Sequence, residues 1–146
     1  MKYFSVKELT YSSTASRQGI DNTPSKRVAS HIEELINTIL DPLREAWGDA
    51  IIVTSGYRCP ELNKAVGGVS SSAHQTGYAA DLYPSNRKFD EFKKFVKKFL
   101  EDYSFDQYIE EMANGRKWVH IGLKPQRGLP RRMFLKFDGK KYVNIK

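Results

Sequence analysis

The chain of 146 residues suits one compact domain, residues 1–146, and its 40% hydrophobic content with 12% aromatic residues excludes a disordered chain. Its 24 Lys and Arg outweigh 17 Asp and Glu to give a net charge of +7, which favours anionic partners, but without a zinc finger or an aromatic-interleaved basic motif we expect no nucleic-acid binding. No run of about 18 apolar residues predicts a transmembrane segment, and the charged start of the chain predicts no signal peptide.

The first third of the chain is predicted to be largely helical. Residues 3–9 favour a short helix, whereas residues 11–21, rich in Ser, Thr and Gly, favour a loop. Thr23 can cap the next helix, Pro24 suits its first position, and we expect Pro42 to bend or interrupt it. The apolar stripe of this helix comprises Val28, Ile32, Leu35, Ile36, Ile39 and Leu40.

Short apolar segments predict strands in the rest of the chain. These segments are residues 51–54, 78–83, 105–111, 118–123, 133–137 and 141–145. Residues 60–66 favour a short helix, and residues 87–102 favour an amphipathic helix that covers the core. Hairpin turns are expected at residues 113–116 and at Asp138-Gly139. The elements together predict an α+β fold, an antiparallel-rich sheet with helices packed against it.

Two of the three histidines form a candidate metal site with an aspartate. His74, Asp81 and His120 offer the imidazole and carboxylate groups that zinc binds. Seven extended residues span roughly 23 Å, whereas the donor atoms of two ligands of one zinc lie about 3 to 4 Å apart. The chain must therefore turn back between His74 and Asp81, and Gly77 is the flexible point for that turn. A lone histidine is more often a satisfied polar group, and we interpret His31, which has no partner motif, in that way.

Four segments, in order along the chain, resemble the zinc D-alanyl-D-alanine carboxypeptidase family, which is peptidase M15-like. The nearer likeness is to its small bacteriophage and prophage branch of endolysins, which is related in fold to the Hedgehog signalling domain. The segments are Ser-Gly-Tyr-Arg-Cys-Pro-Glu-Leu-Asn (55–63), Ser-Ala-His-Gln-Thr-Gly-Tyr-Ala-Ala-Asp (72–81), Phe-Asp-Gln-Tyr-Ile-Glu-Glu (105–111) and Trp-Val-His (118–120).

This resemblance implies a Zn²⁺ site, one per chain, with His74, Asp81 and His120 as ligands. It also implies that Arg58 binds the substrate carboxylate or stabilises the oxyanion. Relatives often carry a general base shortly before the last ligand, but Lys117 and Gly115 stand there in this chain. The phage-like branch points instead to Glu111. Strand alternation puts Glu110 on the opposite face, and it remains the alternative.

Four further residues are candidates for the surroundings of the metal. Ser72, Gln107 and Trp118 are expected on the substrate side. Asp106 either orients a ligand imidazole or serves an ordinary turn or cap. The basic stretch 124–132 is either a clamp for an acidic peptide or a set of solvated charges.

The resemblance implies a hydrolase of cell-wall degradation, a zinc metallopeptidase that cuts peptidoglycan stem peptides. It acts either as a D-Ala-D-Ala carboxypeptidase or as an L-Ala-D-Glu-type endopeptidase, as endolysins of phages do. The alternative is a non-catalytic, zinc-stabilised cell-wall-binding module on the same fold. We expect a monomer that is made in the cytoplasm, where the single Cys59 is compatible with reducing conditions, and that acts on the wall or in the periplasm after phage-induced lysis.

Overall fold

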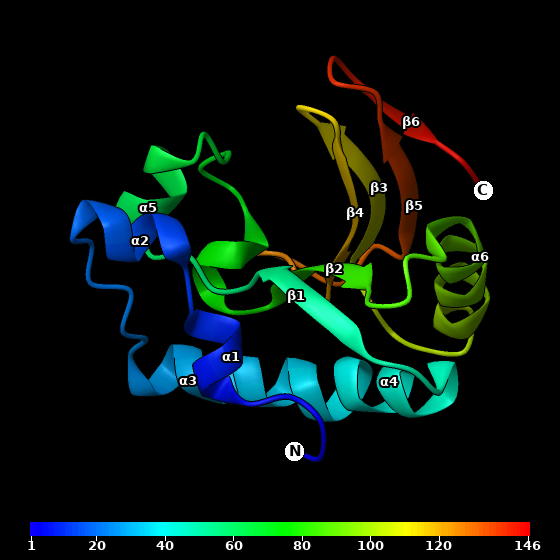
Figure 1. Cartoon of the computed structure of the whole chain (residues 1–146), viewed down its shortest axis with the longest axis horizontal. Coiled ribbons are helices and arrows are strands. Elements are labelled where there is room, and N and C mark those ends of the chain that lie inside the picture. Colours follow the sequence, from blue (N-terminus) through cyan, green and yellow to red (C-terminus); the bar gives the residue numbers. More distant parts are fainter.

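A mixed six-stranded sheet with the order β1-β2-β4-β3-β5-β6 organises the fold (Figure 1). The computed structural model describes residues 1–146. Neighbouring strands are antiparallel except β3 and β5, which run parallel. The expected combination of helices with a sheet is confirmed. The strands are β1 Ile51–Ser55, β2 Ala79–Pro84, β3 Gln107–Ala113, β4 Arg116–Gly122, β5 Met133–Phe137 and β6 Tyr142–Asn144.

The helices lie on several sides of the sheet. In Figure 1, α3 and α4 lie end to end below β1, α6 lies beside the far end of β2, and α2 and α5 stand opposite the β3–β4 hairpin. No helix has both the length and the apolar character needed to cross a membrane. The helices are α1 Val6–Thr10, α2 Ser13–Gln18, α3 Lys26–Leu35, the π-helix η1 Ile36–Leu40, α4 Asp41–Trp47, α5 Pro60–Ala65, the 3₁₀ helix η2 Ala73–Thr76 and α6 Phe89–Leu100.

The apolar stripe predicted on the long helix is buried against the sheet. Ile32, Leu35, Ile36, Ile39 and Leu40 are fully buried in one cluster of 22 residues, which also includes apolar side chains of β2 and β4. Burial of a side chain of this size stabilises a fold by about 1.5–3 kcal/mol. The helical layer therefore holds β2 and β4, the two strands that carry metal-site residues.

The segment 11–21 contains a helix where the sequence predicted a loop. Ser12 accepts a hydrogen bond from the backbone N–H of Ala15 and thereby caps α2. Gly19 ends the helix in the left-handed region, with φ 66°. The prediction was wrong because a serine-rich segment suits a helix start as well as a loop.

The long helix starts later than predicted and passes Pro42 without a break. Ser25, not Thr23, caps α3 by accepting from the N–H of Val28. Before Pro42 the chain widens into the π-helix η1, in which Asp41 N donates to Ile36 O. A wider turn lets the helix continue where the proline ring would otherwise clash with the preceding turn.

Both predicted hairpin turns are present. Asn114 and Gly115 join β3 to β4 with φ values of 53° and 76°, the left-handed pair typical of a tight hairpin. Gly139, with φ 95°, lies in the turn between β5 and β6. Because β3 and β5 are parallel, both turns lie at the same end of the sheet, as Figure 1 shows.

Candidate metal centre

A row of register partners crosses the sheet at the candidate metal centre. Asp81 on β2 pairs with Ser55 on β1 and with His120 on β4, and His120 pairs in turn with Ile109 on β3. Side chains of directly paired residues point to the same face of a sheet. Two of the three predicted ligands are therefore fixed by strand pairing alone.

His74 reaches the same point from a loop. It lies in η2, which ends at Gly77 with φ 84°. A Cβ at Gly77 would lie 3.0 Å from both the carbonyl oxygen of Val28 and the side chain of Ile32, so only glycine fits this turn against α3. The turn that the spacing between His74 and Asp81 required is confirmed.

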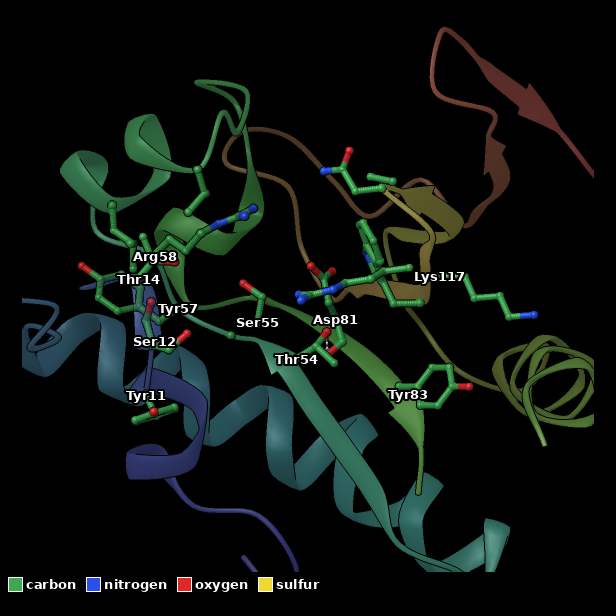
Figure 2. A pocket seen from close by; sticks show the side chains of 18 of the residues that line it. Tyr11, Ser12, Thr14, Thr54, Ser55, Tyr57, Arg58, Asp81, Tyr83 and Lys117 are labelled. Atoms are coloured by element: carbon green, nitrogen blue, oxygen red, sulfur yellow. Dashed lines mark hydrogen bonds between the residues drawn. The ribbon is translucent and has the colours of Figure 1, made fainter. Parts of the chain in front are cut away.

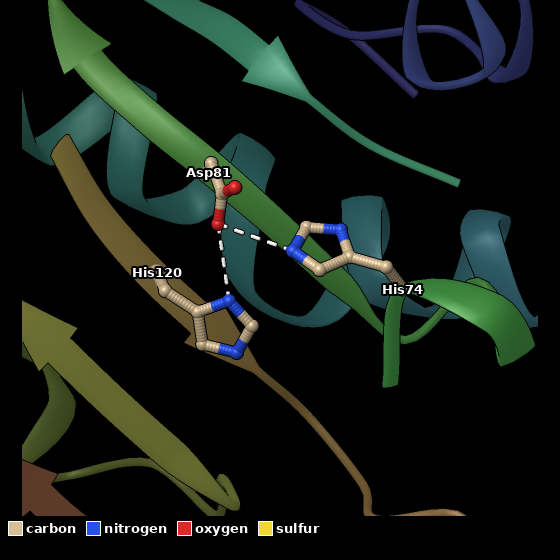
Figure 3. Close-up of side chains that lie close together, drawn as sticks. All are labelled: His74, Asp81 and His120. Atoms are coloured by element: carbon tan, nitrogen blue, oxygen red, sulfur yellow. Dashed lines mark hydrogen bonds and ion pairs between the residues drawn. The ribbon is translucent and has the colours of Figure 1, made fainter. Parts of the chain in front are cut away.

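The three side chains converge on one buried point (Figure 3). One Asp81 oxygen, Oδ1, lies 3.2 Å from His74 Nε2 and 3.0 Å from His120 Nδ1. The three ligand atoms lie within 4.8 Å of one another, and the residues are only 2%, 7% and 8% exposed in chain order. A buried group of this composition could hold a metal ion.

The hydrogen bonds of His74 favour a cation at this point. Its Nδ1–H donates to the carbonyl of Gly56 at 2.7 Å, which leaves Nε2 without a proton in the neutral ring. Burial lowers the pKa of His74, so the neutral ring is favoured. The lone pair of Nε2 then faces a carboxylate oxygen of Asp81. A cation bound by both acceptors removes this repulsion, and two imidazoles with one carboxylate are a donor set that suits zinc.

Charge coupling inside the group supports the same conclusion. Burial alone would raise the pKa of Asp81, but its interactions with the two imidazoles outweigh it and hold that pKa well below its usual range. Asp81 is therefore ionised at neutral pH. Its negative charge is available to a bound cation.

Glu111 lies beside the three ligands on the same face of the sheet. Its Oε1 accepts from Trp118 Nε1 at 3.2 Å and lies 3.9 Å from His120 Nδ1. Burial, followed by the charge of Asp81, raises the pKa of Glu111. A half-buried carboxylate with a raised pKa next to a metal centre is suited to proton transfer.

Glu110 points to the opposite face, as strand alternation requires. Its carboxylate lies 3.3 Å from Lys97 Nζ and 3.9 Å from Lys93 Nζ on α6, and it accepts from the hydroxyl of Tyr108 at 2.8 Å. These contacts occupy the side chain away from His120. Of the two glutamates considered as a base, only Glu111 is near the ligands.

Arg58 brings a positive charge to the edge of the group. The charges of Asp81 and Glu111 act on its guanidinium, although burial has the larger effect and lowers the pKa of Arg58. Its Nη2 donates to Ser72 Oγ at 3.5 Å, and its buried Nε has no hydrogen-bond partner. Arg58 forms no ion pair and lines the cleft described below, so its guanidinium can bind a substrate oxygen.

The structure separates Asp106 from the ligands. Its carboxylate accepts from Arg131 three times, from the backbone N at 3.0 Å and from Nε and Nη2 at 2.8 Å each. No hydrogen bond joins Asp106 to His74 or His120. The group that orients the His74 imidazole is the backbone carbonyl of Gly56, not Asp106. Sequence reasoning missed it because a backbone group has no residue signature.

The remaining candidates lie at different distances from the centre. Ser72 is adjacent to it, because its Oγ also accepts from the N–H of His74 at 3.1 Å. Trp118 contacts Glu111 directly. Gln107 lies further along β3, paired with Gly122, on the face that carries Glu111.

Several cations of the basic stretch 124–132 hold the loop in place. Lys124 Nζ lies 2.7 Å from Glu34, Arg131 binds Asp106, and Arg132 Nη2 donates to the carbonyl of Glu101 at 3.0 Å. These intramolecular contacts leave them poorly placed to act as a clamp for an acidic peptide.

A cleft of about 980 Å³ leads to the centre (Figure 2). Its floor is the end of β1 with Asp81 and Tyr83, and one wall is formed by residues 11–14 and 57–58. The opposite wall is the β3–β4 hairpin, residues 113–118. The cleft has the size of a binding site for a small peptide.

Comparison with known proteins gives one family. Residues 2–122 match the sequence profile of a family described as Peptidase M15. The matched part includes His74, Asp81, His120, Arg58 and Glu111, whereas β5 and β6 lie outside it. No curated protein matches the chain.

Proposed function

The chain belongs to the peptidase M15 family, and we propose that it is a zinc-dependent peptidase that hydrolyses peptidoglycan stem peptides. One observation carries the proposal: the buried His74–Asp81–His120 group lies at the end of a cleft, with Glu111 and Arg58 beside it. A metal that only stabilises a fold needs neither a neighbouring base nor an unpaired guanidinium.

In this proposal His74 Nε2, His120 Nδ1 and an oxygen of Asp81 hold one zinc ion. When bound with three protein ligands, zinc supplies a Lewis acid that polarises a carbonyl group and lowers the pKa of water. Gly56 contributes by fixing the ring of His74 through the hydrogen bond to its Nδ1.

Glu111 takes the role of general base. Its carboxylate accepts a proton from the attacking water as the new C–O bond forms, and it gives that proton to the amine nitrogen as the C–N bond breaks. The raised pKa of Glu111 brings it closer to neutrality, which suits both transfers. Trp118 holds the carboxylate in place through its indole N–H.

Arg58 takes the role of electrostatic partner. Its guanidinium faces either the oxyanion that develops on the scissile carbonyl or a carboxylate of the substrate. Ser72, which accepts from Arg58, stands on the substrate side with Trp118, and Gln107 extends the same face. We also propose that the fold of this chain is related to that of the Hedgehog signalling domain.

The proposal has two forms, which differ in the peptide bond that is cut. A D-Ala-D-Ala carboxypeptidase uses Arg58 to bind the terminal carboxylate, whereas an endopeptidase uses it for the oxyanion. The experiment is an assay of the zinc-loaded protein on purified peptidoglycan and on a D-Ala-D-Ala peptide. Activity on either supports the proposal, and activity on neither contradicts it.

The alternative, a zinc-stabilised wall-binding module without catalysis, makes a different prediction. Glu111→Gln then leaves peptidoglycan binding unchanged and removes no activity. In the peptidase proposal the same variant keeps its metal and loses hydrolysis. The position of Glu111 next to His120 favours the peptidase.

A further inference from the structure

Cations outnumber carboxylates in the cleft. Two arginines, Arg58 and Arg116, line it against the single carboxylate of Asp81, which is already shared between two imidazoles. A cleft lined by one sign of charge attracts the opposite sign. The cleft is therefore suited to a substrate with negative charge beyond that which Arg58 can bind.

Arg116 is the cation that the hairpin presents to this cleft. It is the first residue of β4 and pairs with Ala113 at the end of the hairpin. Alternation along β4 puts Arg116 on the same face as Trp118 and His120. Its exposed side chain has neither an ion pair nor a hydrogen bond in the structure.

The neighbouring cation, Lys117, is directed elsewhere. Its ammonium lies 5.2 Å from the ring centroid of Phe89 on α6, and Figure 2 shows its side chain pointing away from Asp81. Lys117 therefore carries the same charge at the next position of the same strand but on the opposite face. The chain thus offers its own control for the charge of Arg116.

We infer that Arg116 is a specificity-determining residue that binds a carboxylate of the substrate on the hairpin side of the metal centre, so that the preferred substrates are acidic peptides. The inference rests on the proposed peptidase function. A guanidinium binds a carboxylate through two parallel hydrogen bonds, which a lysine reproduces only in charge. Arg58 and Arg116 then hold the peptide from opposite walls of the cleft.

The test uses two stem pentapeptides that differ in one group, a free glutamate carboxylate in the first and its amide in the second. We measure kcat/KM and Kd for both with zinc-loaded wild-type protein, Arg116→Gln, Arg116→Lys and Lys117→Gln. Wild type and Lys117→Gln are expected to prefer the free carboxylate by about two- to fivefold, since the pair is solvent-exposed. Arg116→Gln loses this preference, and Arg116→Lys keeps part of it. Zinc content and melting temperature stay the same in all four.

Two results overturn the inference while leaving the peptidase proposal intact. In the first, Arg116→Gln keeps the wild-type preference. In the second, it lowers kcat/KM and the affinity for both peptides equally. If wild type cleaves neither peptide, the proposed function fails, and the ratio of the two Kd values for wild type and Arg116→Gln still decides the role of Arg116. Raising the salt concentration reduces the preference of wild type if the contact is ionic.

Discussion

Trp118 and Glu111 face each other across the β3–β4 ladder, and the indole N–H of Trp118 donates to Glu111 Oε1 at 3.2 Å. The same carboxylate oxygen lies 3.9 Å from His120 Nδ1. Strand pairing therefore sets the position of the carboxylate, and the indole sets its orientation. Glu111 and His120, the proposed base and one proposed ligand, are therefore held by one hairpin, which suits a preorganised site.

Trp118→Phe is expected to lower kcat while leaving zinc content unchanged. Phenylalanine keeps the aromatic wall but removes the donor to Glu111, so the carboxylate loses one of its anchors. We expect a loss of about tenfold, the worth of one hydrogen bond to a charged group, against about 10²- to 10⁴-fold for Glu111→Gln. Steady-state kinetics of the two variants provides the measurement. Equal losses in both would mean that Trp118 does more than orient the carboxylate.

His120→Ala is expected to abolish zinc binding. It removes one of the three proposed ligands from a group in which Asp81 Oδ1 lies 3.2 Å from His74 Nε2 and 3.0 Å from His120 Nδ1. Elemental analysis of protein purified without a histidine tag should give about one zinc per chain for wild type and close to none for the variant. His31→Gln is the matched control, because His31 Nδ1 contacts Thr76 O and not the metal group. A wild-type protein that takes up no zinc contradicts the candidate site itself.

The two halves of the Asp106–Arg131 pair are expected to contribute unequally to stability. The side chains are 2% and 51% exposed respectively, so water can solvate the arginine but not the aspartate. Arg131→Ala leaves a buried charge without its guanidinium and should lower the free energy of unfolding by about 3 kcal/mol. Asp106→Asn leaves an exposed cation and should cost about 1–2 kcal/mol. Urea denaturation measures both.

Zinc content separates this structural role from the one first considered for Asp106. If Asp106 acted through a ligand imidazole, Asp106→Asn would weaken zinc binding by about 10- to 100-fold. We expect the zinc affinity of folded Asp106→Asn to match that of wild type, because the donors to the Asp106 carboxylate all belong to Arg131 and not to a ligand imidazole. A zinc titration with a competing chelator decides between the two.

The candidate metal group was predictable because the signals of its members are local. His74, Gly77 and Asp81 lie within eight residues of one another, and the residues around His120 have strong strand propensity. Alternation of side chains then tells which residues of the same strand share a face with His120. Alternation also predicted that Glu110 and Glu111 lie on opposite faces, as they do in the structure, whereas the choice of Glu111 came from the family resemblance.

Features that depend on contacts between distant segments could not be predicted in this way. The bond from His74 to Gly56 O joins positions 18 residues apart, and the pairing of Asp106 with Arg131 spans 25 residues. The wider turn before Pro42 also escapes pattern reasoning, since a proline in a helical stretch predicts only a break or a bend. The free cation Arg116 could have been found by counting alternate residues back from His120.

The Glu34–Lys124 pair predicts a pH-dependent part of the stability. Glu34 Oε2 lies 2.7 Å from Lys124 Nζ, and Tyr78 donates its hydroxyl to Glu34 Oε1 at 2.9 Å. The hydrogen bond from Lys124 is the largest cause of the lowered pKa of Glu34. Because the pKa is lower in the folded state, the ionised carboxylate stabilises the fold at neutral pH. This contribution is fully present above the unfolded pKa and disappears as the pH falls through the folded one.

Glu34→Gln should therefore lower the free energy of unfolding at pH 7 by a few tenths to about 1 kcal/mol, a small value because both side chains are partly exposed to water. The difference between variant and wild type should vanish at about pH 2, below the usual range of glutamate pKa values. Comparing the two proteins at each pH cancels the loss of metal that acid causes in both. A difference that stays constant from neutral to acid pH would show that Glu34 acts through packing instead of charge.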